Sequence, residues 1–370
     1  MKVESIIYIY GAVCVSMIVF NIIYNILLKQ NESSLKKRCE KIGKQVDIQL
    51  NAIKDSGKIQ EKHLSYMQHR LRRINNLIAF EKVLKDAINN GKEKEVNKYI
   101  SQIQPVILYL AMLYSHRENM QAGYFTYFLA NYAAKKQMPI DSLQDILLSY
   151  VKKDNLYCRI NALNALYNIG NTEHIITAIK AQDDGVIYIN EKILTEGMLS
   201  FTGNHNELIT TFWKNLNGFS EHTKLAVLNY IRFKTGSYKE EMLSIMLDET
   251  AEKEVRLSAI RYFGKYYYEP ALKYILNFVS NNEPSMWEYA TVAVAALEKY
   301  SGDDVIKALK KAIHSPNWYI RYQAAQSLDA QHLNYNALFD IINGSDRYAR
   351  EMLTYRLESR KLQKVGCGKQ

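Results

Sequence analysis

The chain has 370 residues, of which 48% are hydrophobic and 23% are charged, and its formal net charge is +10. This apolar content is enough to bury a large core, so it excludes an intrinsically disordered chain. Only 16 Gly and 5 Pro occur, which is few for a protein of strands and tight turns and favours helices. We therefore predict an all-α fold.

The first feature along the chain is an apolar run, SIIYIYGAVCVSMIVFNIIYNILL, at residues 5–28. As a helix it would measure about 36 Å, enough to cross a hydrocarbon core of about 30 Å. A signal peptide would be shorter, with a positive start and a small-residue cleavage site, whereas here Lys2 is offset by Glu4. We predict an uncleaved transmembrane helix; the alternative is a buried helix of a soluble core.

Two amides lie inside this run. Asn21 and Asn25 are four residues apart and so share one helix face. Amides in lipid tend to bond across a helix interface, so these two residues are candidates for binding a second transmembrane helix. The alternative is that both lie among hydrated headgroups on the cytoplasmic side.

The positive charge is concentrated next to the run and at the C-terminal end. Residues 29–73 carry 12 Lys and Arg against 5 Asp and Glu, residues 346–370 carry 7 against 3, and residues 74–345 have a net charge of −1. The positive-inside rule therefore predicts a cytoplasmic C-terminal part, although Asn-x-Ser triplets at Asn31 and Asn343 would favour the opposite orientation. The candidate membrane-surface residues are Lys29, Lys36, Lys37, Arg38, Lys41 and Lys44. Since the middle of the chain is near neutral, we expect no nucleic-acid partner.

Residues 29–79 are predicted to form a basic helical stalk. One frame of a/d positions holds Leu35, Cys39, Ile42, Val46 and Ile53, with the polar Gln49 in the same register, and a second holds Leu64, Met67, Leu71, Ile74 and Ile78. The two frames are interrupted at Ser56-Gly57, which is either a turn between antiparallel helices or a skip in one stalk. The apolar positions could serve a coiled-coil homodimer or pack on the next helices, at residues 80–153.

Three later segments share one pattern. DNLYCRINALNALYNIG (residues 154–170), EKEVRLSAIRYFGKY (252–266) and SPNWYIRYQAAQSLDA (315–330) each have a polar turn, then Arg, then apolar residues at helical spacing. Positions aligned with that Arg recur in steps of 29 to 33 residues. These column residues are Arg159, Lys192, Lys224, Arg256, Glu288, Arg321 and Arg350. A constant period near 32 predicts a solenoid of stacked helix pairs.

Residues 154–357 resemble the HEAT repeat family, in particular the short HEAT-like repeats of the phycobilisome lyases. The family's VR-x-x-A-x-x-x-L pattern matches around Arg256 and Arg321, whereas Lys192 and Glu288 depart from it. The resemblance implies a right-handed superhelix of antiparallel helix pairs. It also implies that Arg159, Arg256 and Arg321 bridge to polar groups of the adjacent repeat; the alternative is a row of basic groups that binds an acidic partner.

Residues capable of catalysis are sparse. The four cysteines, Cys14, Cys39, Cys158 and Cys367, are widely spaced without a CxxC pair, and no histidine belongs to an HExxH pattern. We expect no catalytic site, metal or cofactor. An enzyme of the lyase type would have only Cys158 and His174 as reactive groups in its first repeat.

The predicted organisation is a tail and membrane helix (residues 1–28), a stalk (29–79), a helical N-terminal part of the solenoid (80–153), HEAT-like repeats (154–357) and a basic tail (358–370). Solenoids present extended surfaces to partners, so we predict a membrane-anchored scaffold or adaptor for another, membrane-associated protein. Its setting would be a biosynthetic complex, such as one that makes polysaccharide, or a secretion complex. The alternatives are a lyase-like enzyme and a homo-oligomeric structural protein that dimerises through span and stalk.

Overall fold

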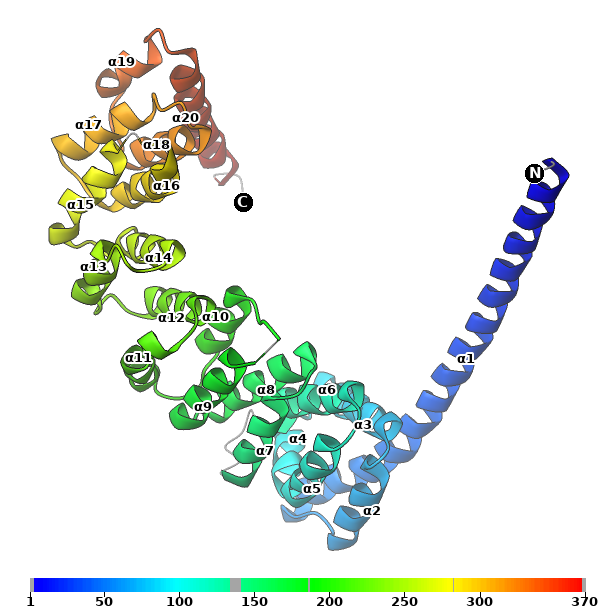
Figure 1. Cartoon of the computed structure of the whole chain (residues 1–370). Helices are drawn as coiled ribbons and strands as arrows, with labels where there is room; N and C mark the ends of the chain where they lie inside the picture. The colour runs from blue at the N-terminus through cyan, green and yellow to red at the C-terminus, as the bar shows by residue number, and fades with distance from the viewer. Residues whose placement is uncertain (1–2, 134–140, 186, 282, 368–370) are drawn as a thin grey trace. The chain divides into compact units, whose positions relative to one another are not determined.

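A computed structural model describes residues 3–133, 141–185, 187–281 and 283–367, and within them the chain forms 20 α-helices and no strand (Figure 1). This confirms the all-α prediction. The first helices are α1 (Val3–Ser56), α2 (Glu61–Leu71), α3 (Ile74–Asn89), α4 (Glu93–Gln102), α5 (Gln104–Ser115), α6 (Asn119–Phe128), α7 (Asp141–Val151), α8 (Leu156–Ile169), α9 (Thr172–Asp183) and α10 (Glu191–Leu199). The others are α11 (His205–Lys214), α12 (Glu221–Lys234), α13 (Lys239–Leu247), α14 (Lys253–Phe263), α15 (Glu269–Ser280), α16 (Trp287–Ala296), α17 (Asp303–Ala312), α18 (Trp318–Ala330), α19 (Phe339–Ile342) and α20 (Arg347–Cys367).

Helix α1 is continuous from the apolar run into the stalk. Its apolar side chains from Val13 to Leu28 are exposed, and it is the one helix, among the residues described, with the length and composition to cross a membrane. A signal sequence near an N-terminus meets the same criterion. Because no described residue covers this surface between Val13 and Leu28, the structure does not bury it as the core helix that we considered.

The C-terminal part of α1 packs on the helices that follow it in the chain. Ile42, Val46, Leu50 and Ile53 are buried where α1 contacts α3 and α4. Of the two alternatives for the stalk, the structure therefore shows packing within the chain, which removes these side chains from a coiled-coil seam. The polar Gln49 is buried as well, and its Oε1 accepts the Gln60 N–H at 2.9 Å.

The chain reverses at the interruption between the two stalk frames. Gly57 has φ 76°, a left-handed value that suits glycine after a helix end. Helix α2 then runs back along α1, since Gln60 lies near Gln49 and Asn76, after α2, bonds Arg38. The turn between antiparallel helices is therefore the correct alternative.

Within each unit, helices two apart along the chain pack on each other. In the first unit α6 contacts α8 and α7 contacts α9, and in the second unit the even-numbered helices from α10 to α20 contact one another in succession. The described chain divides into two compact units, residues 1–189 with 200–204, and residues 190–199 with 205–370. Each unit has its own apolar core, with Phe125 and Leu166 fully buried in the first and Phe263 and Leu328 in the second.

Candidate functional site

The column residues lie at equivalent places in the even-numbered helices. Arg159, Lys224, Arg256, Arg321 and Arg350 are the fourth residues of α8, α12, α14, α18 and α20, and Lys192 and Glu288 are the second residues of α10 and α16. The period read from the sequence thus corresponds to one even-numbered helix per repeat.

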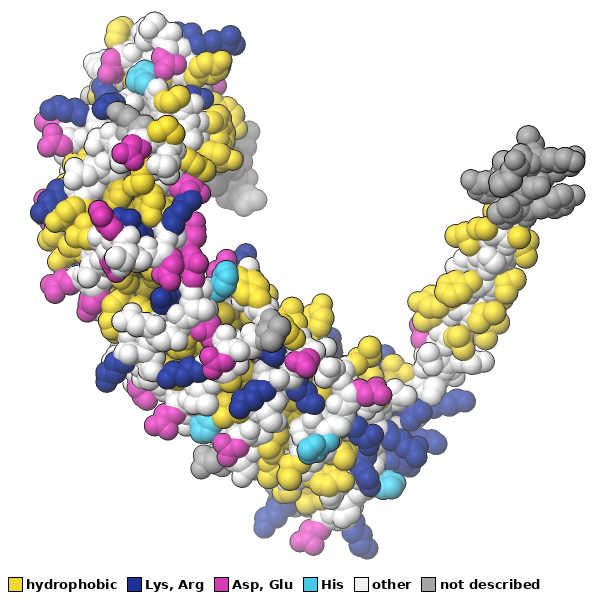
Figure 2. Space-filling model, viewed as in Figure 1, with side chains coloured by type: hydrophobic (Ala, Val, Ile, Leu, Met, Phe, Trp, Pro, Cys, Tyr) yellow, Lys and Arg dark blue, Asp and Glu magenta, His cyan; other side chains and the backbone are white. Residues whose placement is uncertain are grey.

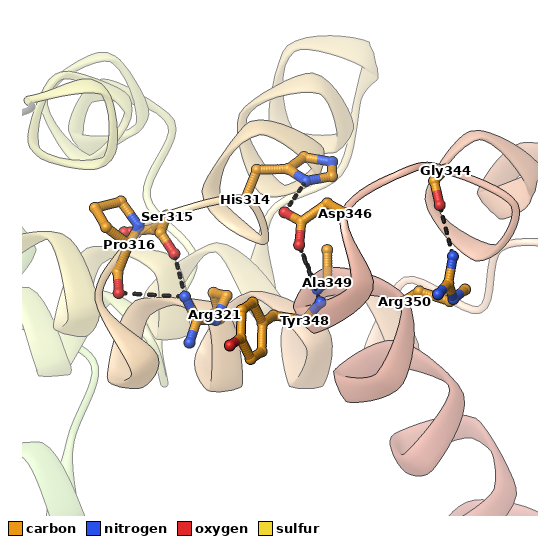
Figure 3. A network of polar contacts seen from close by, with 9 residues as sticks. All are labelled: His314, Ser315, Pro316, Arg321, Gly344, Asp346, Tyr348, Ala349 and Arg350. Atoms are coloured by element: carbon orange, nitrogen blue, oxygen red, sulfur yellow. Dashed lines mark hydrogen bonds and ion pairs between the residues drawn. The ribbon is translucent and has the colours of Figure 1, made fainter.

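Most column arginines bond the turn that precedes their own helix. Arg321 donates to the Ser315 carbonyl at 2.7 Å, and Arg350 donates to the Gly344 carbonyl at 2.9 Å (Figure 3). Arg159, whose side chain is 4% exposed, donates to the Lys153 carbonyl at 2.6 Å. Each of these carbonyls lies six residues before its arginine, so the guanidinium ties the turn to the first turn of the helix.

Contacts with the adjacent repeat are largely to rings. The Arg256 guanidinium lies 5.1 Å from the centre of the Tyr289 ring in α16, and that of Arg321 lies 5.3 Å from the Tyr348 ring in α20. A guanidinium over an aromatic face is a favourable cation–π geometry. The predicted bridge to polar groups of the next repeat is met by Arg159, which donates to Gln182 of α9 at 3.2 Å.

Where the column departs from Arg, ion pairs join the repeats. Lys224 of α12 pairs with Glu252, before α14, at 3.4 Å, and Glu288 of α16 pairs with Lys253 of α14. Lys192 is mostly exposed and pairs only weakly with Glu196 of its own helix. These bonds account structurally for the column, and a role of Arg159, Arg256 and Arg321 in binding an acidic partner stays a prediction.

The asparagines of the apolar run bond their own helix. Asn21 donates to the Met17 carbonyl and Asn25 to the Asn21 carbonyl, both at 2.9 Å. Both side chains are exposed, and each bond uses one of two amide hydrogens. Binding of a second helix at this face stays a prediction.

The two groups named for a lyase-type reaction have unrelated surroundings. Cys158 is fully buried, and burial raises the pKa of its thiol, which disfavours the reactive thiolate. Asn171 caps the start of α9 by accepting the His174 backbone N–H, and the His174 ring bonds the same Asn171 oxygen and lies 3.7 Å from Asp145. Cys158 instead contacts Thr126 and the Tyr150 carbonyl. This geometry offers Cys158 no base of the kind that activates a nucleophile.

The second unit contains a basic groove that sequence analysis missed. Four even-numbered helices, α12, α14, α16 and α18, contribute to it, and its volume is about 430 Å³. One wall carries the cations Arg232, Arg261 and Lys265, and small residues such as Gly264 and Ala296 form much of the rest. No carboxylate lies among the lining residues. We call this hollow the repeat groove.

The cations of the repeat groove are crowded together. The Arg232 guanidinium lies 5.0 Å from the centre of the exposed Phe233 ring, and the Lys265 ammonium lies 5.4 Å from the same ring and donates to the Phe233 carbonyl at 3.1 Å. Arg261 has an acidic neighbour, Glu254, at 3.7 Å. Burial, and then the neighbouring Arg261, lower the pKa of Arg232. The Nε of Arg232 is buried and has no hydrogen-bond partner among the residues that the structure describes.

Burying the Arg232 guanidinium without a partner costs free energy, because a desolvated cation and an unpaired donor both lose their interactions with water. A carboxylate in the groove would offset this cost. Arg232, Gly264 and Ala296 occupy positions 32 residues apart, but their residue types differ, so the sequence carries no pattern that identifies the groove.

Comparison with known proteins is informative for this part of the chain. A family model described as HEAT repeats matches residues 240–329, which include Arg261, Lys265 and Gln323 of the repeat groove. A search of curated proteins finds no match to the chain.

Proposed function

We propose that this chain is a membrane-anchored scaffold whose HEAT repeats hold a partner protein. The exposed apolar part of α1 supports the anchor, because such a surface is stable in lipid and costly in water. HEAT repeats support the scaffold, because stacked repeats present extended surfaces for partners. We extend the repeats to residues 154–357, on the support of the column residues in α8 to α20. The role proposed is binding, not catalysis.

We place the partner in the repeat groove. The observation that carries this proposal is the buried and unpartnered Nε of Arg232 beside Arg261 and Lys265. An acidic segment of a partner protein would supply the missing acceptor and offset the like charges. A membrane-bound biosynthetic or secretion complex is the setting we favour for that partner.

Binding of an acidic peptide to the full-length chain in detergent tests this proposal. We expect a fluorescent Glu-rich peptide to bind and its Gln-rich analogue not to bind, by fluorescence anisotropy. Arg261→Glu with Lys265→Glu should weaken binding by about tenfold or more, since both like-charge repulsion and lost pairs act. The matched control is Lys307→Glu with Lys311→Glu, which makes the same charge change on α17 and should bind as the unchanged chain does.

Equal loss in both double variants would show that net charge, and not the groove, attracts the peptide. A second measurement uses membranes of the source cell: a photo-crosslinking residue in place of Phe233 should capture a protein, and the Arg261→Glu/Lys265→Glu change should abolish the capture.

A further inference from the structure

A second basic hollow lies in the first unit, where the exposed apolar part of α1 ends. Its volume is about 260 Å³, and its cations come from two helices: Lys37, Arg38 and Lys41 from α1, and Arg70 from the end of α2. Figure 2 shows Lys and Arg side chains gathered in this region at the base of α1. We call this hollow the juxtamembrane pocket.

Three residues hold the pocket in shape. Arg38 donates to the Asn76 Oδ1 at 2.9 Å, and the Asn76 amide donates to the Arg70 carbonyl at 2.8 Å. Asn76 is only 6% exposed, so it is a fixed link between α1 and the end of α2. The Arg70 guanidinium also lies 5.5 Å from the centre of the Tyr66 ring, which lines the same pocket. Arg38 and Arg70 are thus positioned by the fold before any ligand arrives.

The four cations of the pocket are not neutralised within the described chain. None of them forms an ion pair with a carboxylate there, although Glu32 and Glu40 lie on the same stretch of α1. The first turn of α3 adds to the positive electrostatic potential of the pocket. Asn75 and Asn76 lie there, at the positive end of the helix dipole, and that turn contains no acidic residue. A bound anion would relieve the repulsion among these charges.

The position of the pocket along α1 suits a lipid headgroup. Ser34, at its near edge, is six residues beyond Leu28, or about 9 Å along the helix, and Arg38 is about 15 Å beyond. The headgroup layer is roughly 5–8 Å thick on each side of the hydrocarbon core. Side chains on a helix lean toward its N-terminus, so those of Lys37, Arg38 and Lys41 lean back toward the bilayer. Their long stems let the charged ends reach the lipid phosphates.

We propose that the juxtamembrane pocket binds the phosphate of an anionic phospholipid headgroup, with Arg38 and Arg70 donating to phosphate oxygens and Lys37 and Lys41 adding charge. This inference rests on the membrane anchor of the proposed function and is independent of the repeat groove. Guanidinium groups suit the site because they donate to phosphate oxygens in pairs.

The test uses the full-length chain in lipid nanodiscs made of phosphatidylcholine with added phosphatidylglycerol, and native mass spectrometry measures which lipid stays bound. We expect phosphatidylglycerol to be retained over phosphatidylcholine. Arg38→Gln with Arg70→Gln should reduce that preference about 30-fold, the effect of two basic residues at a membrane surface. The matched control, Arg72→Gln with Arg73→Gln, removes the same charge from the neighbouring exposed turn and should change the preference less than threefold.

A further variant avoids any effect on folding. Lys37→Gln with Lys41→Gln alters two exposed side chains that make no hydrogen bond in the described chain, and it should also lower the preference. The proposal that the pocket binds this lipid is wrong if all three double variants lose the preference equally, or if the unchanged chain retains both lipids equally. Displacement of the lipid by inorganic phosphate at a similar concentration would show a site for soluble phosphate instead. Incorporation into nanodiscs reports the anchor separately, so failure of the pocket is distinct from failure of the span.

Discussion

Most column residues make contacts of three kinds, which are hydrogen bonds to the preceding turn, contacts with rings of the next repeat and ion pairs. Arginines tie a turn to its helix and stack on a ring of the next repeat, as Arg321 does with Ser315 and Tyr348. Lysine and glutamate use ion pairs instead, as Glu288 does with Lys253. All column residues therefore lie in the first turn of an even-numbered helix, while the chemistry of their contacts varies. This explains why a strict arginine pattern finds only some of the repeats.

A buried histidine makes the first unit sensitive to acid. His63 of α2 is 4% exposed and bonds the Tyr99 hydroxyl at 2.7 Å, and burial lowers its pKa to about 4. Between pH 6.5 and about 4 the unfolded chain binds a proton at this residue that the folded chain does not bind. We expect the free energy of unfolding to fall by roughly 3 kcal/mol as pH decreases through this window.

Urea unfolding of the full-length chain in detergent, followed by circular dichroism across this pH range, measures the effect. His63→Gln removes the titrating group while keeping a polar side chain, and it should flatten the pH dependence. The exposed His116 provides the control, because His116→Gln should leave the dependence unchanged. A steep dependence in the His63→Gln chain would show that other groups cause the acid sensitivity.

Helix α1 is one continuous helix with two different kinds of surface. Between Val13 and Leu28 it presents exposed apolar side chains, and its C-terminal part buries one stripe on α3 and α4. The helix has no break at Lys29, where the sequence changes from apolar to basic. The proposed anchor therefore belongs to the same helix that packs in the first unit, and the juxtamembrane pocket lies where its exposed apolar part ends.

Two glycines at helix ends share a left-handed φ but differ in how closely other residues approach them. Gly170 ends α8 with φ 82°, and Gly91 follows α3 with φ 81°. A Cβ at Gly170 would lie 3.1 Å from Thr202 Oγ1 and 3.2 Å from the Gly203 nitrogen, whereas at Gly91 nothing lies within 4 Å. We expect Gly91→Ala to cost about 1–2 kcal/mol from backbone strain alone, and Gly170→Ala to cost roughly 1–3 kcal/mol more from crowding.

Thermal or urea unfolding of the two variants under identical conditions gives the difference. Since the backbone angles match, the comparison isolates the contact with the turn after α10. Equal destabilisation by the two substitutions would mean that Thr202 and Gly203 move away at no cost.

Over its 370 residues, the protein concentrates its positive charge next to the apolar helix. Residues 29–73 supply a net +7, and folding brings part of this charge into the juxtamembrane pocket. The positive-inside rule then favours an orientation with both compact units in the cytoplasm. That orientation stays a proposal.

Cysteine labelling of intact cells tests the orientation. In a chain whose Cys14, Cys39 and Cys367 are replaced by Ala, Lys2→Cys should react with a membrane-impermeant maleimide, because it precedes the span. Ser33→Cys, which follows the span at an exposed position, should react only after permeabilisation. Reaction of Ser33→Cys in intact cells would reverse the orientation, and cleavage of the N-terminal run would appear as the loss of any label at position 2.

The sequence predicts that the candidate binding surfaces are basic, but it does not predict which basic residues lie together. The sequence showed that the residues after Leu28 are basic, yet Arg38 and Arg70 are 32 residues apart, and only the reversal at Gly57 brings them together. The repeat groove was missed because its three cations come from two successive repeats and follow no pattern within either one. The arginine column was found for the opposite reason, since the same local role recurs in every repeat.

The sequence by itself determined the helical class, the apolar run, the charge distribution and the repeat period. Each of these depends on neighbours within one or two helical turns, or on a spacing that the chain repeats, so pattern alone reveals it. The tertiary structure decided how the stalk packs, which cations become neighbours and which are left without an acceptor. Those outcomes depend on contacts between residues distant in sequence, where burial and the loss of water set the energy of each group.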